Sequence, residues 1–184
     1  MTKPLLEERT KGPADAPIAI TEFSDFQCPS CAASQEPLKN ILNQFPNLIR
    51  LQFRHFPLGM HQFALDAAKS AECASMQRNF WDYHNLLFKE QAVWSKDPDA
   101  KTLFLAYANA VKLERVGYAQ CLENPQTLAH IEEDKRTGEE LQVSSTPTFF
   151  INGERFVGAK QLTEKGALFI KATLESLVVR KGNG

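Results

Sequence analysis

The stretch "EFSDFQCPSC" occupies residues 22–31 and places two cysteines, Cys28 and Cys31, two residues apart. The apolar, β-branched segment Pro17–Phe23 predicts a buried strand, and the residues from Cys28 to Gln44 predict a helix that follows it. A sulfur at a helix N-terminus is close to unpaired backbone N–H groups and to the positive end of the helix dipole. Both favour thiolate over thiol, which lowers a cysteine pKa and makes Cys28 the candidate attacking sulfur.

The spacing of Cys28 and Cys31 along one helical turn brings the two sulfurs near enough to close a disulfide. Pro29 suits the first turn of the helix, where its missing N–H is no loss. A structural zinc site would need four ligands, and the sequence has no second CxxC and no HxxxH to supply the others. The pair is therefore interpreted as a redox centre, and no metal site is expected.

Glu22 stands inside the apolar strand, six residues before Cys28. A carboxylate is expensive to bury unless it has a role or a partner. Beneath a dithiol it would take or return the proton of Cys31 during exchange. The alternative is that Glu22 faces outward on an alternating strand, and the residues alone favour neither reading.

Elsewhere the pattern predicts an order of strand, helix, strand, helical block, strand, strand, helix. Residues 1–16 are polar and contain prolines, which predicts a loose N-terminal arm. Gly138 is expected to mark a helix end, and Thr163 to cap the terminal helix. The remaining elements are predicted as strands at Asn47–Phe56, 146–153 and 154–158, and helices at 62–76, 78–91, 99–111, 114–123, 125–141 and Glu164–Val179.

The segment "SSTPTFF" at residues 144–150 opens the third predicted strand with a proline. A cis bond between Thr146 and Pro147 would expose the backbone of Thr146 to an incoming peptide. Since an X-Pro bond is trans roughly nineteen times in twenty, the residues by themselves do not establish the cis form.

Composition narrows the class of protein. The chain has 184 residues, 43% of them hydrophobic, and a formal net charge of −1. This balance gives no broad basic field, so nucleic acid and anionic membrane surfaces are poor candidates for partners. The longest apolar runs are far too short to span a bilayer, and the first residues lack the apolar region of a signal peptide.

Taken together, several blocks resemble the DsbA-like thiol:disulfide oxidoreductases of the thioredoxin superfamily. The match runs from about Gly12 to Gly158, and the blocks are "GPADAPIAITEFSDFQCPSC", "FRHFPL", "AAKSAECA", "FWDYHNLLF" and "VSSTPTFFINGERFVGA". The resemblance implies an α/β thioredoxin fold, a β-α-β unit plus a β-β-α unit. It also implies a single domain over residues 1–184 with a helical insertion at about residues 58–140.

The resemblance also implies roles for individual residues. Cys28 would be the nucleophile, Cys31 the resolving cysteine and Glu22 the buried acid. Thr146 and Pro147 would form a cis-proline loop that binds substrate. No cofactor is expected, since the Cys28–Cys31 disulfide is itself the redox group.

Pro29 and Ser30, between the cysteines, are the expected redox-tuning residues. The best-known strong oxidant of the family has histidine where Ser30 stands, and a serine hydroxyl brings no positive charge. We therefore expect a reduction potential between about −120 mV, the DsbA value, and about −270 mV, the thioredoxin value. A glutathione titration that placed the pair at or above the DsbA value would contradict this hypothesis.

Cys73 and Cys121 lie in separate predicted helices of the insertion. Each is either a small buried residue or one half of a structural disulfide, and both readings stay open.

The predicted function is disulfide exchange with thiol- or disulfide-containing protein substrates, in the direction of a dithiol oxidase. The alternatives are a reductase or isomerase of the same fold, and a non-catalytic redox-sensing or peptide-binding module. A monomer is expected, with a membrane redox partner that re-oxidises or reduces it. The resemblance implies a mature periplasmic or cell-envelope protein without its signal; a cytoplasmic protein that starts at Met1 is the alternative.

Overall fold

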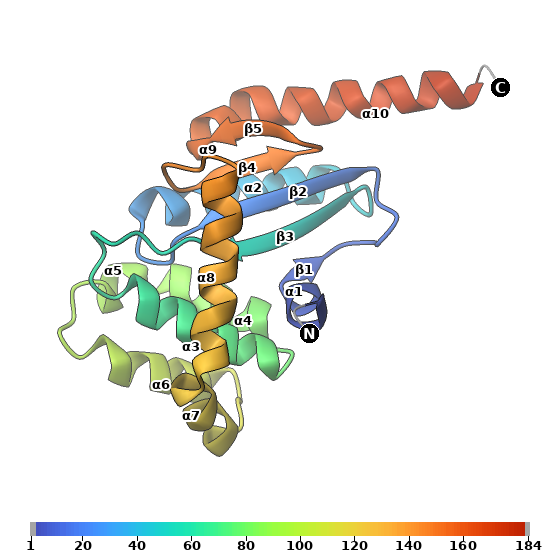
Figure 1. The fold of residues 1–184 in the computed structure, drawn as a ribbon. Helices are drawn as coiled ribbons and strands as arrows, with labels where there is room; N and C mark the ends of the chain where they lie inside the picture. The colour runs from blue at the N-terminus through green and yellow to red at the C-terminus, as the bar shows by residue number, and fades with distance from the viewer. Residues whose placement is uncertain (1–2, 183–184) are drawn as a thin grey trace.

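A computed structural model describes residues 3–182 and shows a five-stranded mixed sheet with the order β1-β3-β2-β4-β5 (Figure 1). Strand β2 runs parallel to β3 and antiparallel to β4, while β1 and β5 add antiparallel edges. The positive φ angles of Asn152 and Gly153 form the predicted two-residue turn between β4 and β5. The strands are β1 (Thr10–Lys11), β2 (Ile18–Ser24), β3 (Ile49–His55), β4 (Thr148–Ile151) and β5 (Glu154–Val157).

Helices cover both faces of this sheet. Six of them, α3 to α8, lie between β3 and β4 in the sequence and form the helical insertion (Figure 1). The helices are α1 (Lys3–Glu8), α2 (Pro29–Gln44), α3 (Ala64–Met76), α4 (Phe80–Lys89), α5 (Gln91–Trp94), α6 (Ala100–Ala110), α7 (Arg115–Glu123), α8 (Pro125–Glu140), α9 (Gly158–Gln161) and α10 (Ala167–Gly182), with a π-helical turn η1 (Leu162–Gly166) between the last two.

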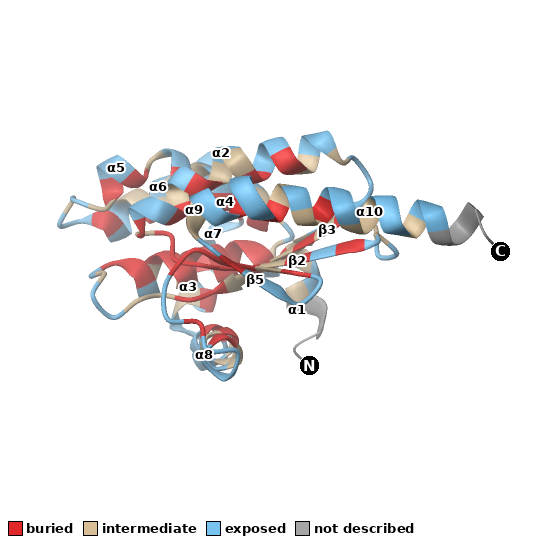
Figure 2. Cartoon of the chain, turned by 90° about the horizontal axis from the view of Figure 1, so that it is seen from above, coloured by how far each residue is buried: buried red, intermediate tan, exposed pale blue. Residues whose placement is uncertain are grey.

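The layers place α2 and α10 on one side of the sheet and α8 on the other (Figure 2). Apolar side chains alternate along the central strands, and the set that includes Ile20 and Leu51 packs against Leu38 and Ile41 of α2. Phe53 of β3 belongs to a second apolar cluster that extends into the insertion and includes Phe26, Cys28 and Cys31. The segment that joins β2 to α2 therefore lies where the sheet meets the helical block.

The N-terminal arm differs from the prediction. Part of it, from residue 3 onward, forms α1 and β1, and Thr10 pairs with Gln52 at the sheet edge. Arg9 is buried at 3% exposure and forms ion pairs with Glu72 and Asp134. The prediction of a loose arm was wrong because the residues that hold this segment in place, Gln52, Glu72 and Asp134, are far away in the sequence. Residues 1 and 2 lie outside the described part of the chain.

Two predicted helix boundaries were also wrong. The chain is already helical from Gly158, and the Thr163 hydroxyl donates to the Ala159 carbonyl from within the π-helical turn, so Thr163 is not an N-cap. Helix α8 continues past Gly138 to Glu140. Gly138 is instead a point of close contact, since a Cβ there would lie 2.6 Å from Cε2 of Phe56.

Candidate active site

Cys28 is the residue at which the chain passes from the loop after β2 into α2. Its backbone is extended, with φ −73° and ψ 120°, and Pro29 occupies the first helical position. The Cys28 carbonyl accepts hydrogen bonds from the N–H groups of Cys31 and Ala32. Cys31 thus lies one turn further along, and both thiols are free in this structure.

The surroundings of Cys28 favour its thiolate. A hydrogen bond from the Cys31 thiol lowers the pKa of Cys28 most, against the opposing effect of burial, and the value falls from 9.0 to about 5. The Thr146 side chain and the backbone N–H groups of Cys31 and Ser30 add to this lowering. Cys28 would therefore be ionised at neutral pH.

Cys31 is in the opposite situation. It has no exposed surface, and burial followed by the hydrogen bond to Cys28 raises the pKa of its thiol well above 9.0. The Asp25 N–H donates to the Cys31 sulfur over 3.4 Å and partly offsets this. The surroundings thus favour a thiolate at Cys28 and a protonated thiol at Cys31.

Thr146 and Pro147 lie beside the cysteines, although 115 or more residues separate them in the sequence. The bond between them is cis, and the Thr146 carbonyl oxygen is 3.5 Å from the Cys28 sulfur. The Thr148 hydroxyl donates to the Ser145 carbonyl and fastens the start of β4.

Glu22 points into the interior rather than outward, with no exposed surface. Burial raises its pKa from 4.5 to about 7, although hydrogen bonds from Ser24 and Gln35 and the charge of Lys11 oppose the rise. Gln35 links Glu22 to the dithiol, because its amide donates both to Glu22 Oε1 at 3.1 Å and to the Cys31 carbonyl at 3.2 Å. A carboxyl with this pKa can hold or release a proton near neutral pH.

The two residues between the cysteines, Pro29 and Ser30, are exposed on the first turn of α2. The interaction that the structure gives Ser30 toward Cys28 is its backbone N–H. A backbone donor of this kind does not depend on the side chain at position 30.

Cys73 of α3 and Cys121 of α7 are joined by a disulfide, with an S–S distance of 1.99 Å and a Cα–Cα distance of 5.6 Å. The bond lies in the helical insertion and connects segments 48 residues apart. Within residues 3–182, no group of three or more His, Cys, Asp or Glu side chains is arranged to hold a metal ion. Nor is any helix in that range long and apolar enough to cross a membrane.

Residues that the sequence analysis did not single out also shape the site. Gln91 of α5 donates to the carbonyls of Phe26 and Cys28 at 2.7 and 2.9 Å. Lys11 of β1 acts on Glu22 through its charge and lies 4.0 Å from the centre of the Trp81 ring. Of the missed residues, Gln35 alone had a sequence signal, since it follows Cys31 by four positions on the same helix face.

Comparison with known proteins identifies the family. A family model described as Thioredoxin matches residues 6–170, so the chain belongs to the thioredoxin family. Wolbachia pipientis alpha-DsbA1 superposes with a TM-score of 0.81 at 22% identity, covering 94% of this chain and 93% of that one. BdbD from Bacillus subtilis, in its oxidised form, gives 0.78 at 21% identity, covering 94% and 96%. The predicted thioredoxin fold class is thereby confirmed, and the resemblance to DsbA-like proteins is confirmed at the level of the fold.

Sequence relatives include much larger proteins. The chain is 33% identical over 166 residues to the Na(+)/H(+) antiporter NhaA 1 of Salinispora arenicola, a match that covers 90% of this chain. The antiporter NhaA 1 of Mycolicibacterium vanbaalenii is 29% identical over 153 residues. In both cases the chain spans 24% of the length of the relative.

Proposed function

We propose that this chain is a protein thiol:disulfide oxidoreductase that works through Cys28 and Cys31 as a dithiol oxidase. The observation that carries the proposal is the geometry of two free thiols one helical turn apart at the start of α2, with the Thr146 carbonyl oxygen 3.5 Å from the Cys28 sulfur. The lowered pKa of Cys28 and the raised pKa of Cys31 agree with this geometry. A stabilised Cys28 thiolate stabilises the reduced form, and this makes the corresponding disulfide a better oxidant.

The exchange follows from this arrangement. In the oxidising direction a substrate thiolate attacks the Cys28 sulfur, the bond to Cys31 breaks, and Cys31 leaves with the electron pair. A second substrate thiolate then attacks the mixed disulfide, and Cys28 leaves as its stable thiolate. In the reducing direction the Cys28 thiolate attacks a substrate disulfide, and Cys31 resolves the intermediate.

We assign Glu22 the role of acceptor and donor for the proton of Cys31. Two observations support this role: the Glu22 pKa of about 7 lies near neutrality, and the Gln35 amide donates both to Glu22 and to the backbone carbonyl of Cys31. Thr146 and Pro147 are assigned to substrate binding because the Thr146 carbonyl adjoins the attacking sulfur. No metal or organic cofactor enters the scheme.

The proposed setting is the periplasm or cell envelope, where protein thiols are oxidised and a membrane redox partner regenerates the disulfide. Support comes from the DsbA-like fold. A monomer would suffice, because the groups named above come from one chain.

The test compares wild type with Cys28→Ala in oxidative refolding of a reduced substrate protein and in insulin reduction. An oxidase accelerates refolding, whereas a reductase is most active on insulin. A glutathione titration of the Cys28–Cys31 pair gives the potential directly. Equal behaviour of the wild type and Cys28→Ala in both assays would refute the enzymatic proposal.

The antiporter relatives favour a second candidate function. The chain matches a segment that makes up 24% of the length of proteins named Na(+)/H(+) antiporters. A redox-sensing module attached to a larger membrane protein therefore fits the same fold. Such a module would form its Cys28–Cys31 disulfide reversibly but would show no turnover in either assay.

A further inference from the structure

Asp25 is a buried carboxylate in the loop between β2 and α2, and the exchange scheme above does not use it. Its side chain is 0% exposed. Oδ1 accepts a hydrogen bond from the Gln27 N–H at 2.7 Å. Oδ2 accepts from the Leu58 N–H at 2.9 Å and from Nδ1 of His61 at 2.7 Å. A buried carboxylate with three donors is held firmly in one orientation.

The main chain of Asp25 contacts both redox cysteines. Its N–H donates to the Cys31 sulfur at 3.4 Å, and its carbonyl accepts from the Cys28 N–H at 3.1 Å. Contacts that fix the Asp25 carboxylate therefore also fix the Asp25 N–H, which donates to the Cys31 sulfur. This sulfur is the leaving group of the proposed exchange.

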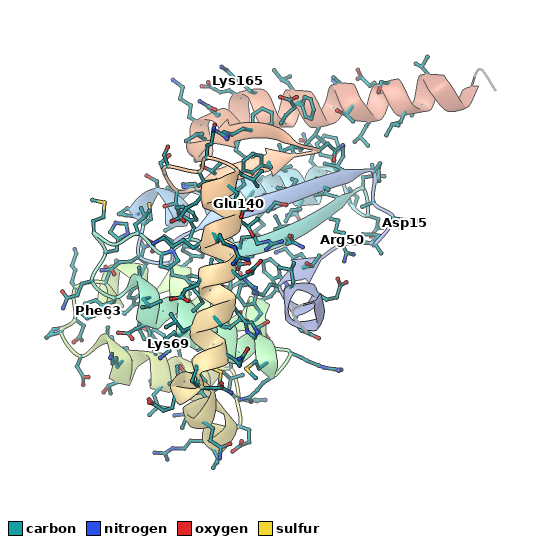
Figure 3. All side chains as sticks on the ribbon, in the orientation of Figure 1. Asp15, Arg50, Phe63, Lys69, Glu140 and Lys165 are labelled. Carbon is teal, nitrogen blue, oxygen red and sulfur yellow. A yellow bond between two sulfur atoms is a disulfide. The ribbon has the colours of Figure 1, made fainter. Side chains whose placement is uncertain are left out.

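The loop that holds the Asp25 carboxylate lies between β3 and α3 in the sequence. His61 belongs to this loop, and its side chain is 18% exposed. Phe63 follows two residues later and is labelled in Figure 3; its N–H donates to Oε1 of Gln27 at 2.6 Å. The loop is thus joined to residues 25–27 by hydrogen bonds from Leu58, His61 and Phe63.

We propose that Asp25 and His61 form a positioning pair for the dithiol. His61 holds the Asp25 carboxylate, and the Asp25 N–H then stabilises negative charge on the Cys31 sulfur. The inference rests on the proposed exchange function, which it deepens by adding two residues that act through the backbone.

The pair acts when the Cys28–Cys31 bond breaks. The attacking substrate thiolate forms a new S–S bond to Cys28, and the electron pair of the old bond leaves on Cys31 beside the Asp25 N–H. In the fully reduced protein the same N–H withdraws charge from the Cys31 sulfur, which strengthens the hydrogen bond from the Cys31 thiol to the Cys28 thiolate. Loss of the pair should therefore disfavour the reduced form.

The experiment compares His61→Leu with His61→Asn in the full chain. The readouts are the equilibrium constant with glutathione and the Cys28 pKa from thiolate absorbance. For His61→Leu we expect the equilibrium constant for reduction to fall roughly three- to tenfold and the Cys28 pKa to rise, as for a weakened hydrogen bond to a charged group. The amide of His61→Asn can donate to Asp25 and should restore most of the wild-type value.

Met60→Gln is the matched control, since Met60 lies in the same loop at 83% exposure. It should leave both readouts unchanged. A His61→Leu protein that loses thermal stability but keeps the wild-type equilibrium constant and Cys28 pKa would overturn the proposal.

Asp25→Asn decides the question if His61→Leu does not fold. Removal of a negative charge alone would favour the thiolates and raise the equilibrium constant, whereas loss of positioning lowers it. We expect a decrease, and an increase would overturn the proposal. Because these equilibria use glutathione alone, they stay measurable even if the wild type shows no turnover and the proposed enzymatic function fails.

Discussion

At the scale of single residues, position rather than residue type decides chemistry at this site. Cys28 and Cys31 are the same amino acid three positions apart, yet their pKa values move in opposite directions. Cys28 receives hydrogen bonds at the helix N-terminus, whereas Cys31 has no exposed surface. Glu22 shows the same principle, because burial converts an ordinary carboxyl into one with a pKa of about 7.

Replacement of Glu22 by glutamine should stabilise the reduced protein at alkaline pH. Because its folded pKa is raised from 4.5 to about 7, the stability of the wild type relative to the variant is retained below pH 4.5 and lost as pH rises through 7. We expect Glu22→Gln to raise the free energy of unfolding by about 3 kcal/mol at pH 8 and by under about 1 kcal/mol at pH 5.

Urea denaturation at the two pH values measures this difference. Glu36→Gln serves as the control, since the Glu36 side chain is 69% exposed on α2, and it should change the free energy by under about 0.5 kcal/mol. If Glu22→Gln raised the free energy of unfolding by the same amount at pH 5 and at pH 8, Glu22 would not titrate as described.

At the scale of elements, helix α8 packs closely against the sheet at Gly138. A Cβ on Gly138 would lie 2.6 Å from Cε2 of Phe56 and 3.0 Å from Cδ1 of Phe23. These two rings pack edge to face with their centroids 6.1 Å apart, and both are buried. The glycine that was predicted to end a helix is therefore a packing residue.

Gly138→Ala should destabilise the protein despite the higher helix propensity of alanine. The propensity gain is about 1 kcal/mol, but displacement of two buried rings costs more, so we expect a net loss of about 1–2 kcal/mol. Chemical denaturation compares it with Gly59→Ala, where an added Cβ meets nothing within 4 Å. A Gly138→Ala protein as stable as the wild type would mean that the rings move freely.

At the scale of the whole molecule, a buried ionic cluster joins the N-terminal segment, the sheet and the insertion. Arg9 pairs with Glu72 of α3 at 3.2 Å and with Asp134 of α8. Asp134 also accepts from Arg54 at 2.9 Å and from the His55 N–H at 3.0 Å. Burial would raise the pKa of Glu72, but Arg9, followed by His130 and His55, holds it well below 4.5.

Arg9→Met should leave the buried Glu72 without its main counter-ion and leave Asp134 with its ion pair to Arg54. We expect a loss of about 3–5 kcal/mol at pH 7. The depressed pKa of Glu72 means that its stabilising contribution is fully present above pH 4.5 and is lost gradually as pH falls from 4.5 to the much lower pKa of the folded state. The effect of Arg9→Met should therefore be smaller at pH 4 than at pH 7, with most of it retained.

The control is Arg50→Met, which removes an exposed pair with Glu7 at 2.7 Å. It should cost under about 1 kcal/mol at either pH. Thermal or urea unfolding at pH 7 and pH 4 measures both variants, and equal losses for Arg9→Met and Arg50→Met would contradict a structural role for the cluster.

The sequence by itself determined the order of the main elements and the position of Cys28 and Cys31 at a strand-to-helix junction. Strand and helix periodicity are local, and so is the passage from strand to helix at Cys28. The strand that begins in the "TPTFF" segment and the Asn152-Gly153 turn could likewise be predicted from neighbouring residues.

Only the tertiary structure decided what depends on distant contacts. It turned Glu22 inward, paired Cys73 with Cys121, and ordered the N-terminal segment through Arg9. It also brought His61 to Asp25 from 36 residues away. Burial and ion pairing are properties of neighbours in space, so no local pattern could have specified them.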